Sequence, residues 1–376
     1  MILIYSEIVF GYYLVSKQSR IKVEKLYLGG SIMKRISGFV KGVNLGGWLS
    51  QCDEYTYEHY DTFITESDVD NIARLGFDHV RVPVDYNVIE KDDNDYIEEG
   101  FKYIDACRDW CKKNGLKMII DLHKTFGYSF DPLDKIDRVD FFTNEANIQR
   151  FIHLWKYIGA RYADCSDFVC YELLNEIIKD EVAEDWNKVV MRTIPAIREV
   201  APDSMIIFGG VRYNSITAVP MLVDPKDDKV IYTFHCYDPL IFTHQAAYWV
   251  DGMPSDFRIG YPGTIEEYRE KSLMLTQELG GALYTQDFKG LGPEFFEQLF
   301  EPALKIAEER NIPLYCGEYG VIDQADPEDT VRWMKDINSV FEKYGIGRAY
   351  WNYKEKDFGL VSGHYDSVMD GMMSAM

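Results

Sequence analysis

Two glutamates, Glu176 and Glu318, end runs of apolar sequence, where a carboxylate is costly to bury without a partner. Glu176 ends the run CYELLNE beside Asn175, and Glu318 ends the run IPLYCGE. Glycoside hydrolysis uses two carboxyl groups, one that protonates the leaving oxygen and one that attacks the sugar or activates water. The two glutamates therefore suggest this chemistry, provided that the fold brings two distant parts of the chain together.

Further polar or aromatic side chains stand in or just after other apolar runs. They are Arg81 in HVRVP, His123 in DLH, His235 and Tyr237 in FHCYDP, and Trp351 in AYWNY. Any one of them alone is more often a structural residue than a catalyst. Together they include several ionisable groups, whose burial costs free energy unless the groups satisfy one another. The sequence therefore predicts that these residues share one functional site.

Eight apolar runs are candidates for buried parallel strands. They cover residues 39–45, 79–84, 117–123, 168–174, 205–210, 230–235, 312–318 and 348–352. Helical periodicity is found between them over 66–75, 145–162, 184–200, 293–310 and 327–344, and Thr65 and Asp68 are spaced as a capping box. This alternation predicts an α/β fold, a single (β/α)8 (TIM) barrel. A doubly wound open sheet is the alternative, although the sequence lacks the glycine-rich first turn typical of that fold.

In such a barrel the site forms at the carboxyl ends of the strands. Runs four and seven lie on opposite sides of an eight-stranded barrel, so Glu176 and Glu318 are expected to face each other. The connection between His235 and Ile312 is far longer than a crossover needs, and we expect residues 238–292 to form a helical insertion after the sixth strand. Residues 33–376 are expected to be one catalytic domain, and residues 1–32 an extension outside the barrel.

The composition limits the partners of the chain. Its net charge of −22 opposes binding to nucleic acid or to an anionic membrane. The seven cysteines include no pair with the two-residue spacing of a zinc knuckle, so we expect buried reduced thiols, no metal and no cofactor. Reduced thiols and a poor match to a secretory signal favour a cytoplasmic location, with export by an unrecognised signal as the alternative. We also expect a monomer.

The motifs LLNE, CGEYG, HVRVP, DLH, FHCYDP and AYWNY resemble the strand-end motifs of glycoside hydrolase family 5, which belongs to a clan of retaining β-glycosidases. GVNLGGWLSQ, CKKNGL and FTHQAAYW further resemble the bacterial endoglucanase C type, and the resemblance extends over residues 36–360. It implies a retaining endo-β-1,4-glucanase that acts on cellulosic and mixed-linkage β-glucans. Three other retaining activities of the family stay open, namely β-mannanase, xyloglucanase and exo-β-1,3-glucanase.

The resemblance also implies a role for each matching residue. Glu176 would be the acid/base and Glu318 the nucleophile, Asn175 would bind the sugar 2-hydroxyl, Arg81 and Tyr237 would hold Glu318 ionised, His235 would orient Glu176, His123 would contact the sugar, and Trp351 would form its stacking floor. Six residues on loops at the same face are candidate subsite groups, although each could equally be structural: Asn44, Trp48, Tyr128, Asn214, Trp249 and Asp357.

Two other classes of protein also stay open. A metal-dependent barrel hydrolase would use His123, His235 and the two glutamates, but the sequence has no His-x-His or bridging-lysine pattern. A non-catalytic sugar-binding barrel would share the fold. Such a protein tends to lose one of its carboxylates, whereas this sequence keeps both.

Overall fold

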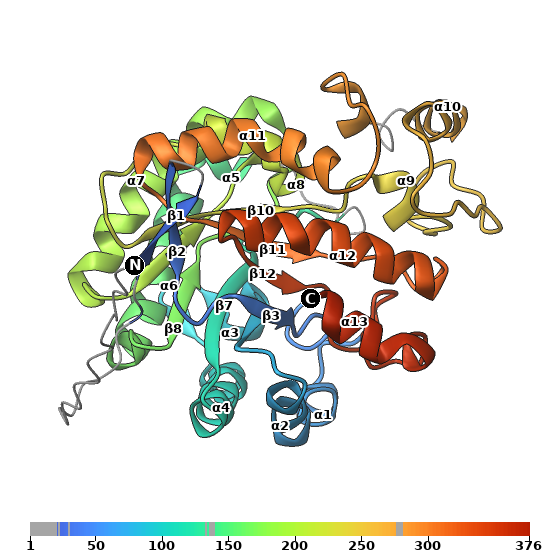
Figure 1. Ribbon diagram of the computed structural model, residues 1–376. Helices are drawn as coiled ribbons and strands as arrows, with labels where there is room; N and C mark the ends of the chain where they lie inside the picture. The colour runs from blue at the N-terminus through green and yellow to red at the C-terminus, as the bar shows by residue number, and fades with distance from the viewer. Residues whose placement is uncertain (1–20, 22, 29–30, 132–133, 135–139, 276–280) are drawn as a thin grey trace, which may run out of the picture.

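The computed structural model describes residues 21, 23–28, 31–131, 134, 140–275 and 281–376. Within these residues, eight parallel strands close into a barrel (Figure 1). In barrel order they are β3 (Lys41–Asn44), β4 (His79–Asp85), β7 (Lys117–Lys124), β8 (Val169–Glu172), β9 (Met205–Phe208), β10 (Val230–His235), β11 (Leu314–Tyr319) and β12 (Gly347–Tyr350). Each strand coincides closely with one of the eight apolar runs, and the predicted (β/α)8 barrel is confirmed.

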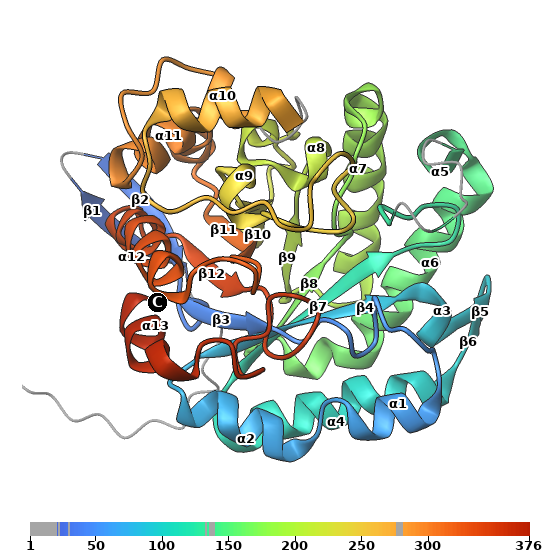
Figure 2. The same cartoon turned by 90° about the vertical axis from the view of Figure 1, so that its right-hand side faces the viewer.

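Long helices surround the barrel (Figure 2). They are α2 (Glu66–Arg74), α4 (Glu98–Asn114), α6 (Glu145–Tyr162), α7 (Ala183–Val200), α11 (Pro293–Arg310) and α12 (Pro327–Tyr344). Each helix expected from the periodicity is among them. Shorter elements are α1 (Tyr57–Thr62), α3 (Tyr86–Ile89), α5 (Asp140–Thr143), α13 (Met369–Ala375), the strands β5 (Glu90–Asp92) and β6 (Asp95–Tyr96), and the 3-10 helices η1 (Ala163–Cys165), η2 (Asp180–Val182) and η6 (Asp366–Val368).

The connection between β9 and β10 departs from the expected alternation, because it contains no long helix. It forms α8 (Val211–Asn214) and the 3-10 helix η3 (Ile216–Met221) instead. Pro220 lies inside η3, and a proline in the interior of an α-helix removes a hydrogen bond and costs about 3 kcal/mol. Helix α11 packs against η3 and so covers this side of the barrel.

The interior of the barrel changes from apolar to polar along the strands. Near the amino ends, an apolar layer includes Ile119, Cys170, Ile207, Ile231 and Tyr315. Side chains alternate along a strand, so residues two positions further point into the same interior. On β7 and β8 these residues are Asp121 and Glu172, both fully buried. The polar layer directly beneath the mouth of the barrel therefore begins inside the strands.

The two expected additions to the barrel lie at its opposite ends in Figure 1. Strands β1 (Val23–Leu28) and β2 (Ser31–Ile36) form an antiparallel hairpin separate from the barrel sheet, and Ile36 packs on the apolar layer. The expected domain boundary at residue 33 thus falls inside β2, and residues 1–20 lie outside the described residues. The expected insertion contains α9 (Leu240–Thr243), α10 (Ile265–Leu275) and η5 (Ala282–Tyr284). No helix in the described ranges has both the length and the apolar character needed to span a bilayer.

Removal of the Asp68 carboxylate should destabilise the start of α2. Asp68 Oδ2 accepts hydrogen bonds from the backbone N–H and the hydroxyl of Thr65, each at 2.8 Å. We expect Asp68→Ala to lower the free energy of unfolding by about 1 kcal/mol in urea denaturation. Asp68→Asn keeps an acceptor and should lose less than half as much. Equal losses in both variants would instead assign the effect to the charge pair between Asp68 and Lys354, which are 3.3 Å apart.

Candidate active site

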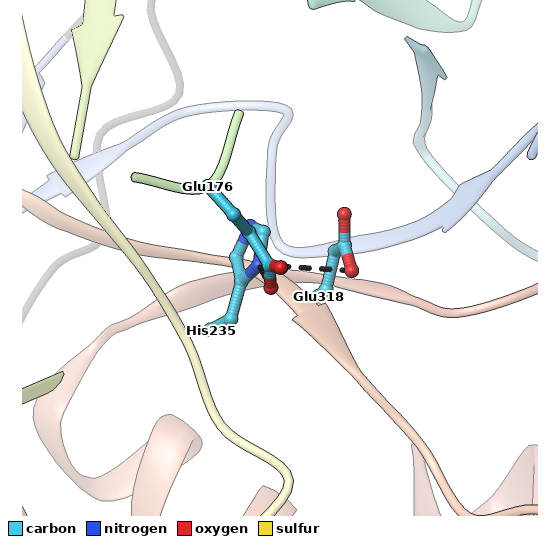
Figure 3. Close-up of side chains that lie close together, drawn as sticks. All are labelled: Glu176, His235 and Glu318. Atoms are coloured by element: carbon cyan, nitrogen blue, oxygen red, sulfur yellow. Dashed lines mark hydrogen bonds and ion pairs between the residues drawn. The ribbon is translucent and has the colours of Figure 1, made fainter. Parts of the chain in front are cut away.

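Glu176 and Glu318 approach each other at the carboxyl ends of the strands (Figure 3). Glu176 lies on the loop after β8, and Glu318 lies within β11. His235, the last residue of β10, places its Nδ1 atom 2.8 Å from Glu176 Oε1 and 3.6 Å from Glu318 Oε2. One atom from each of the three side chains lies within 4.8 Å of the others. The structure thus brings together the two carboxyl groups that the sequence places far apart.

An irregularity in β11 accompanies the inward direction of Glu318. Tyr315 belongs to the apolar layer inside the barrel, so strict alternation would point a side chain three residues later outward. The register of β11 shifts between Cys316 and Tyr319 against β12, and that of β10 shifts between Phe234 and His235 against β11. Such irregularities re-aim side chains next to active sites. The pairing on both sides of β11 therefore accounts for Glu318 reaching the site.

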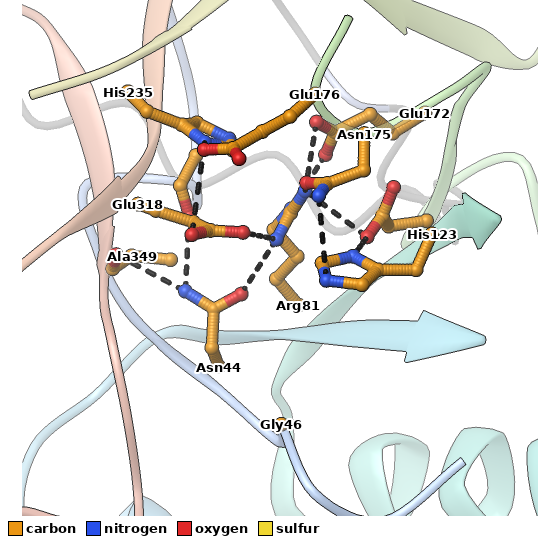
Figure 4. A network of polar contacts seen from close by, with 12 residues as sticks. Asn44, Gly46, Arg81, His123, Glu172, Asn175, Glu176, His235, Glu318 and Ala349 are labelled. Atoms are coloured by element: carbon orange, nitrogen blue, oxygen red, sulfur yellow. Dashed lines mark hydrogen bonds and ion pairs between the residues drawn. The ribbon is translucent and has the colours of Figure 1, made fainter. Parts of the chain in front are cut away.

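Arg81 lies at the centre of the polar network in Figure 4. It is fully buried in β4, in the middle of the strand rather than at the expected strand end. Its Nη1 donates to Glu318 Oε1 at 2.8 Å and to Asn44 Oδ1 at 3.0 Å. Its Nε donates to Glu172 Oε2 at 2.7 Å, and its Nη2 donates to Asn175 Oδ1 at 2.8 Å. One guanidinium therefore orients these four side chains, from β3, β8, β11 and the loop after β8, at once.

A second branch of the network reaches His123 through Asp121. Arg81 Nη2 is 3.0 Å from Asp121 Oδ2, and the same oxygen is 2.6 Å from His123 Nδ1. The other ring nitrogen of His123 lies 3.3 Å from Asn175 Nδ2. Burial raises the pKa of Asp121 and of Glu172 to about 7, although the nearby Arg81 opposes the rise. Three carboxylates, counting Glu318, thus share one guanidinium.

The two glutamates have different electrostatic environments. Burial and then the negative charge of Glu318 raise the pKa of Glu176 well above its ordinary value. Burial also raises the pKa of Glu318, but the charge of Arg81 and a hydrogen bond from the Tyr237 hydroxyl at 2.9 Å both lower it. When the pair holds a single proton, that proton therefore belongs on Glu176, and Glu318 carries the charge.

Three other titratable groups around the pair, two histidines and a tyrosine, are neutral. Burial lowers the pKa of His123 to about 3 and that of His235 well below its ordinary value. Burial and the charge of Glu318 raise the pKa of Tyr237 well above its ordinary value. Two neutral imidazoles and a protonated phenol therefore surround the carboxyl groups, and the phenol is available as a hydrogen-bond donor to Glu318.

Trp351 lies directly after β12, close to the catalytic-face residue His123. Its ring is nearly parallel to the His123 ring, with an interplanar angle of 4° and centroids 5.8 Å apart. A side chain at Gly46 would collide with the Trp351 ring, because a Cβ there would lie 2.6 Å from Cη2. Trp351 packs with Ala247 of the insertion and with Ile322 and Phe358. The glycine makes room for the ring, and the insertion supports it.

Four of the six candidate subsite residues make structural contacts, which favours the structural alternative that the sequence left open for each of them. All four are buried, and each has a structural hydrogen bond. Asn44 donates to Gly317 O at 3.0 Å, the Trp48 indole donates to Tyr60 O at 2.9 Å, the Tyr128 hydroxyl donates to Glu176 O at 2.8 Å, and Asn214 Oδ1 accepts from the Gly210 N–H at 3.0 Å. Their side chains are almost wholly inaccessible to solvent in this structure. Tyr128 does act on the site, by holding the loop that carries Glu176.

The remaining two candidates are accessible. Trp249, on the insertion, is 39% exposed and contacts His244 and Phe358. Asp357 is half-buried, and burial followed by the charge of Asp323 raises its pKa. Four further exposed aromatic residues follow strands at the same end of the barrel and were not predicted: Tyr55, Phe126, Tyr213 and Tyr248. Their signal in the sequence is an aromatic residue soon after the end of an apolar run.

Asp121 and Glu172 are the site residues that the sequence reasoning missed. Both lie inside apolar runs, in KMIIDLH and VCYELL, and both are fully buried. The signal was available, because a carboxylate in the middle of a buried strand is costly unless it is paired. Asp121 also lies two residues before His123 and therefore on the same face of β7.

The close group of Glu176, His235 and Glu318 also has the donor atoms of a metal site. Two carboxylates and an imidazole are ligands that a divalent transition metal accepts. In this structure, however, Glu318 already accepts from Arg81 and Tyr237, and His235 is in contact with Glu176. The protein's own groups therefore orient the two carboxyl groups without a metal ion.

Comparison with known proteins agrees with this geometry. The family model described as Cellulase (glycosyl hydrolase family 5) matches residues 39–357. The chain is 39% identical over 327 residues to Endoglucanase C of Acetivibrio thermocellus, covering 86% of this chain and 94% of that protein. It is 41% identical over 316 residues to Cellodextrinase A of Ruminococcus flavefaciens, covering 84% and 86%. A solved structure, cellulose synthase subunit Z of Clostridioides difficile, shares the fold with a TM-score of 0.71 at 24% identity, over 90% of this chain and 99% of that one. The chain therefore belongs to glycosyl hydrolase family 5.

Proposed function

We propose that this glycoside hydrolase is a retaining endo-β-1,4-glucanase that cleaves cellulosic and mixed-linkage β-glucans by double displacement. The observation that carries the proposal is the approach of Glu176 and Glu318, with a carboxylate oxygen of each within 4.8 Å of the other. Retaining glycosidases separate their carboxyl groups by about 5–5.5 Å, whereas inverting enzymes need about 6.5–9.5 Å to admit a water. The relatives named Endoglucanase C and Cellodextrinase A support a β-1,4-glucan as the substrate.

In the first step, Glu318 attacks the anomeric carbon while Glu176 gives its proton to the glycosidic oxygen. The bond to the leaving sugar breaks, and a covalent glycosyl-enzyme forms on Glu318. Arg81 and Tyr237 donate hydrogen bonds to Glu318, so the nucleophile starts as an aimed carboxylate. His235, a neutral imidazole, contacts Glu176 and fixes the direction of its proton.

In the second step, the deprotonated Glu176 takes a proton from water. The oxygen of that water attacks the anomeric carbon, Glu318 leaves as a carboxylate, and the sugar departs with its original β-configuration. Once Glu318 is esterified its negative charge is gone, so the largest charge effect that raises the pKa of Glu176 is removed. The same residue can therefore act as an acid in one step and as a base in the next.

Substitution of each glutamate should separate the two roles. We expect Glu318→Gln to form no glycosyl-enzyme and to lower kcat/KM by at least about 10³-fold. Glu176→Ala should lower the rate on unactivated glucan by roughly 10²–10⁴-fold, because a positioned acid is lost. On an aryl cellobioside with an activated leaving group, formation of the glycosyl-enzyme by Glu176→Ala should be close to that of wild type. Wild-type-like turnover of glucan by either variant would overturn the assigned roles.

Product analysis should identify both the stereochemistry and the substrate. NMR spectra taken early in the reaction should show the β-anomer of the new reducing end first; the α-anomer first would overturn the retaining mechanism. Cellohexaose and barley β-glucan should be cleaved internally, whereas mannan, xyloglucan and laminarin should react more slowly. Preference for any of these three would favour the corresponding β-mannanase, xyloglucanase or exo-β-1,3-glucanase activity.

Full activity after dialysis against EDTA is expected, and its loss would favour a metal-dependent hydrolase.

The acidic side of the pH profile should depend on Tyr237. Its hydroxyl donates to Glu318 and lowers the pKa of that carboxyl group. Tyr237→Phe removes the donor, so the pKa of Glu318 should rise. The acidic limb of kcat/KM, below which Glu318 is protonated and inactive, should therefore move to higher pH. A matched control is Tyr268→Phe, which removes a tyrosine hydroxyl that donates to Gly260 O in the insertion, away from the acid pair. An identical shift of the acidic limb in both variants would contradict the role of Tyr237.

A further inference from the structure

Asp121 is a fully buried carboxyl group to which the two steps above give no role. Its Oδ2 atom is close to His123 Nδ1 and to Arg81 Nη2, at 2.6 Å and 3.0 Å. Its Oδ1 atom has no hydrogen-bond partner among the described residues. A buried carboxyl group with one unpaired oxygen costs free energy, so its retention in the barrel interior needs an explanation.

Arg81 determines the orientation of the Asn175 amide. A guanidinium carries five N–H donors and no acceptor, so the atom that faces it at 2.8 Å must be the carboxamide oxygen, Oδ1. The amino group of Asn175 then lies on the other side, 3.3 Å from His123 Nε2. The choice between the two amide orientations is thus settled by the donor-only character of Arg81.

The orientation of Asn175 in turn determines the tautomer of His123. The Asn175 amino group only donates, so His123 Nε2 must be the unprotonated nitrogen. Burial keeps the ring neutral, because it lowers the pKa of His123 to about 3. The single ring proton is therefore on Nδ1, and it needs an acceptor. Asp121 Oδ2, at 2.6 Å, is that acceptor.

We propose that Asp121 is a positioning residue for the reacting subsite, which acts through His123 and Asn175. By accepting the Nδ1–H of His123, it holds the tautomer whose Nε2 accepts one N–H of Asn175. The second N–H of Asn175 is then aimed at the 2-hydroxyl of the sugar. The opposite tautomer would set N–H against N–H and turn the Asn175 amide away. This inference rests on the proposed function, since it assumes that Asn175 binds the 2-hydroxyl.

The tautomer can be read directly from ¹⁵N NMR of the histidine-labelled protein, with the His123 signals assigned by comparison with His123→Asn. We expect a protonated Nδ1 in wild type and in Asp121→Asn, because the asparagine oxygen can replace Oδ2 as the acceptor. We expect a protonated Nε2 in Asp121→Leu, which offers no acceptor. A protonated Nε2 in wild type overturns the proposal. If Asp121→Leu fails to fold, the wild-type and Asp121→Asn spectra still decide.

A substrate comparison separates positioning from a general loss of structure. Asp121→Leu should lower kcat/KM on an aryl β-cellobioside by about 10²-fold, since small misplacements of a positioning group have effects of this size. On the analogue that lacks the 2-hydroxyl of the reacting glucosyl unit, the same substitution should cost less than about threefold, because the affected contact is already missing. Asp121→Asn should show the same pattern with a smaller loss. Equal losses on both substrates overturn the proposal.

Two controls complete the design. Asp329→Asn neutralises a buried carboxyl group on α12, outside the network. It should leave unchanged the ratio of kcat/KM on the aryl β-cellobioside to kcat/KM on the analogue without the 2-hydroxyl. Trapping of a glycosyl-enzyme on Glu318, detected by mass spectrometry of wild type, tests the proposed function separately. An enzyme that forms this intermediate but shows equal losses on both substrates contradicts only the role of Asp121. An enzyme that forms no intermediate on Glu318 contradicts the proposed function itself.

Discussion

The guanidinium of Arg81 is the interaction on which the arrangement of the site depends. It is fully buried, and it donates to Glu318, Glu172 and the side-chain oxygens of Asn44 and Asn175. Because it can only donate, each of these atoms must be an acceptor, and the orientation of both amides follows. A lysine would supply the same charge without the planar set of donors, so it could not impose these orientations. The network is costly to bury, and the hydrogen bonds that Arg81 makes offset part of that cost.

The barrel contributes two further constraints. Because side chains alternate between the two faces of each strand, the barrel interior holds an apolar layer first, then a layer with Asp121 and Glu172, and then the acid pair at the carboxyl ends. Asp121 and Glu172 therefore lie beneath the mouth of the barrel. The register shifts beside β11 then interrupt this alternation and direct Glu318 inward. The acid pair thus requires both a regular barrel and a local departure from regularity. The unequal environments of the two glutamates follow from position, because Arg81 and Tyr237 reach Glu318 while Glu176 lies beside His235.

The sequence predicted the eight strands well, because strands buried on both faces are nearly continuous in apolar residues. It also predicted which strands carry Glu176 and Glu318, since opposite positions in a closed barrel follow from strand order. It did not predict the proline-containing 3-10 helix after β9, where periodicity is absent. It left open whether Trp48 and Asn214 are structural or contact sugar, because the burial of such a side chain depends on how the surrounding chain folds, which no local pattern records. Asp121 was missed because only polar residues at the carboxyl ends of the strands were taken as candidates, and Asp121 lies inside β7.

The packing around Trp351 joins the insertion after β10 to the loops that follow β11 and β12. The ring is supported by Ala247 from the insertion as well as by Ile322 and Phe358 from the barrel loops, and Gly46 leaves room for it on the other side. The insertion also carries the exposed Trp249. A graft that replaced this insertion with one from a relative would consequently alter the packing of the Trp351 ring as well as the exposed surface around Trp249. Any exchange of the insertion therefore has to preserve a small apolar residue at position 247, or the tryptophan beneath it must repack.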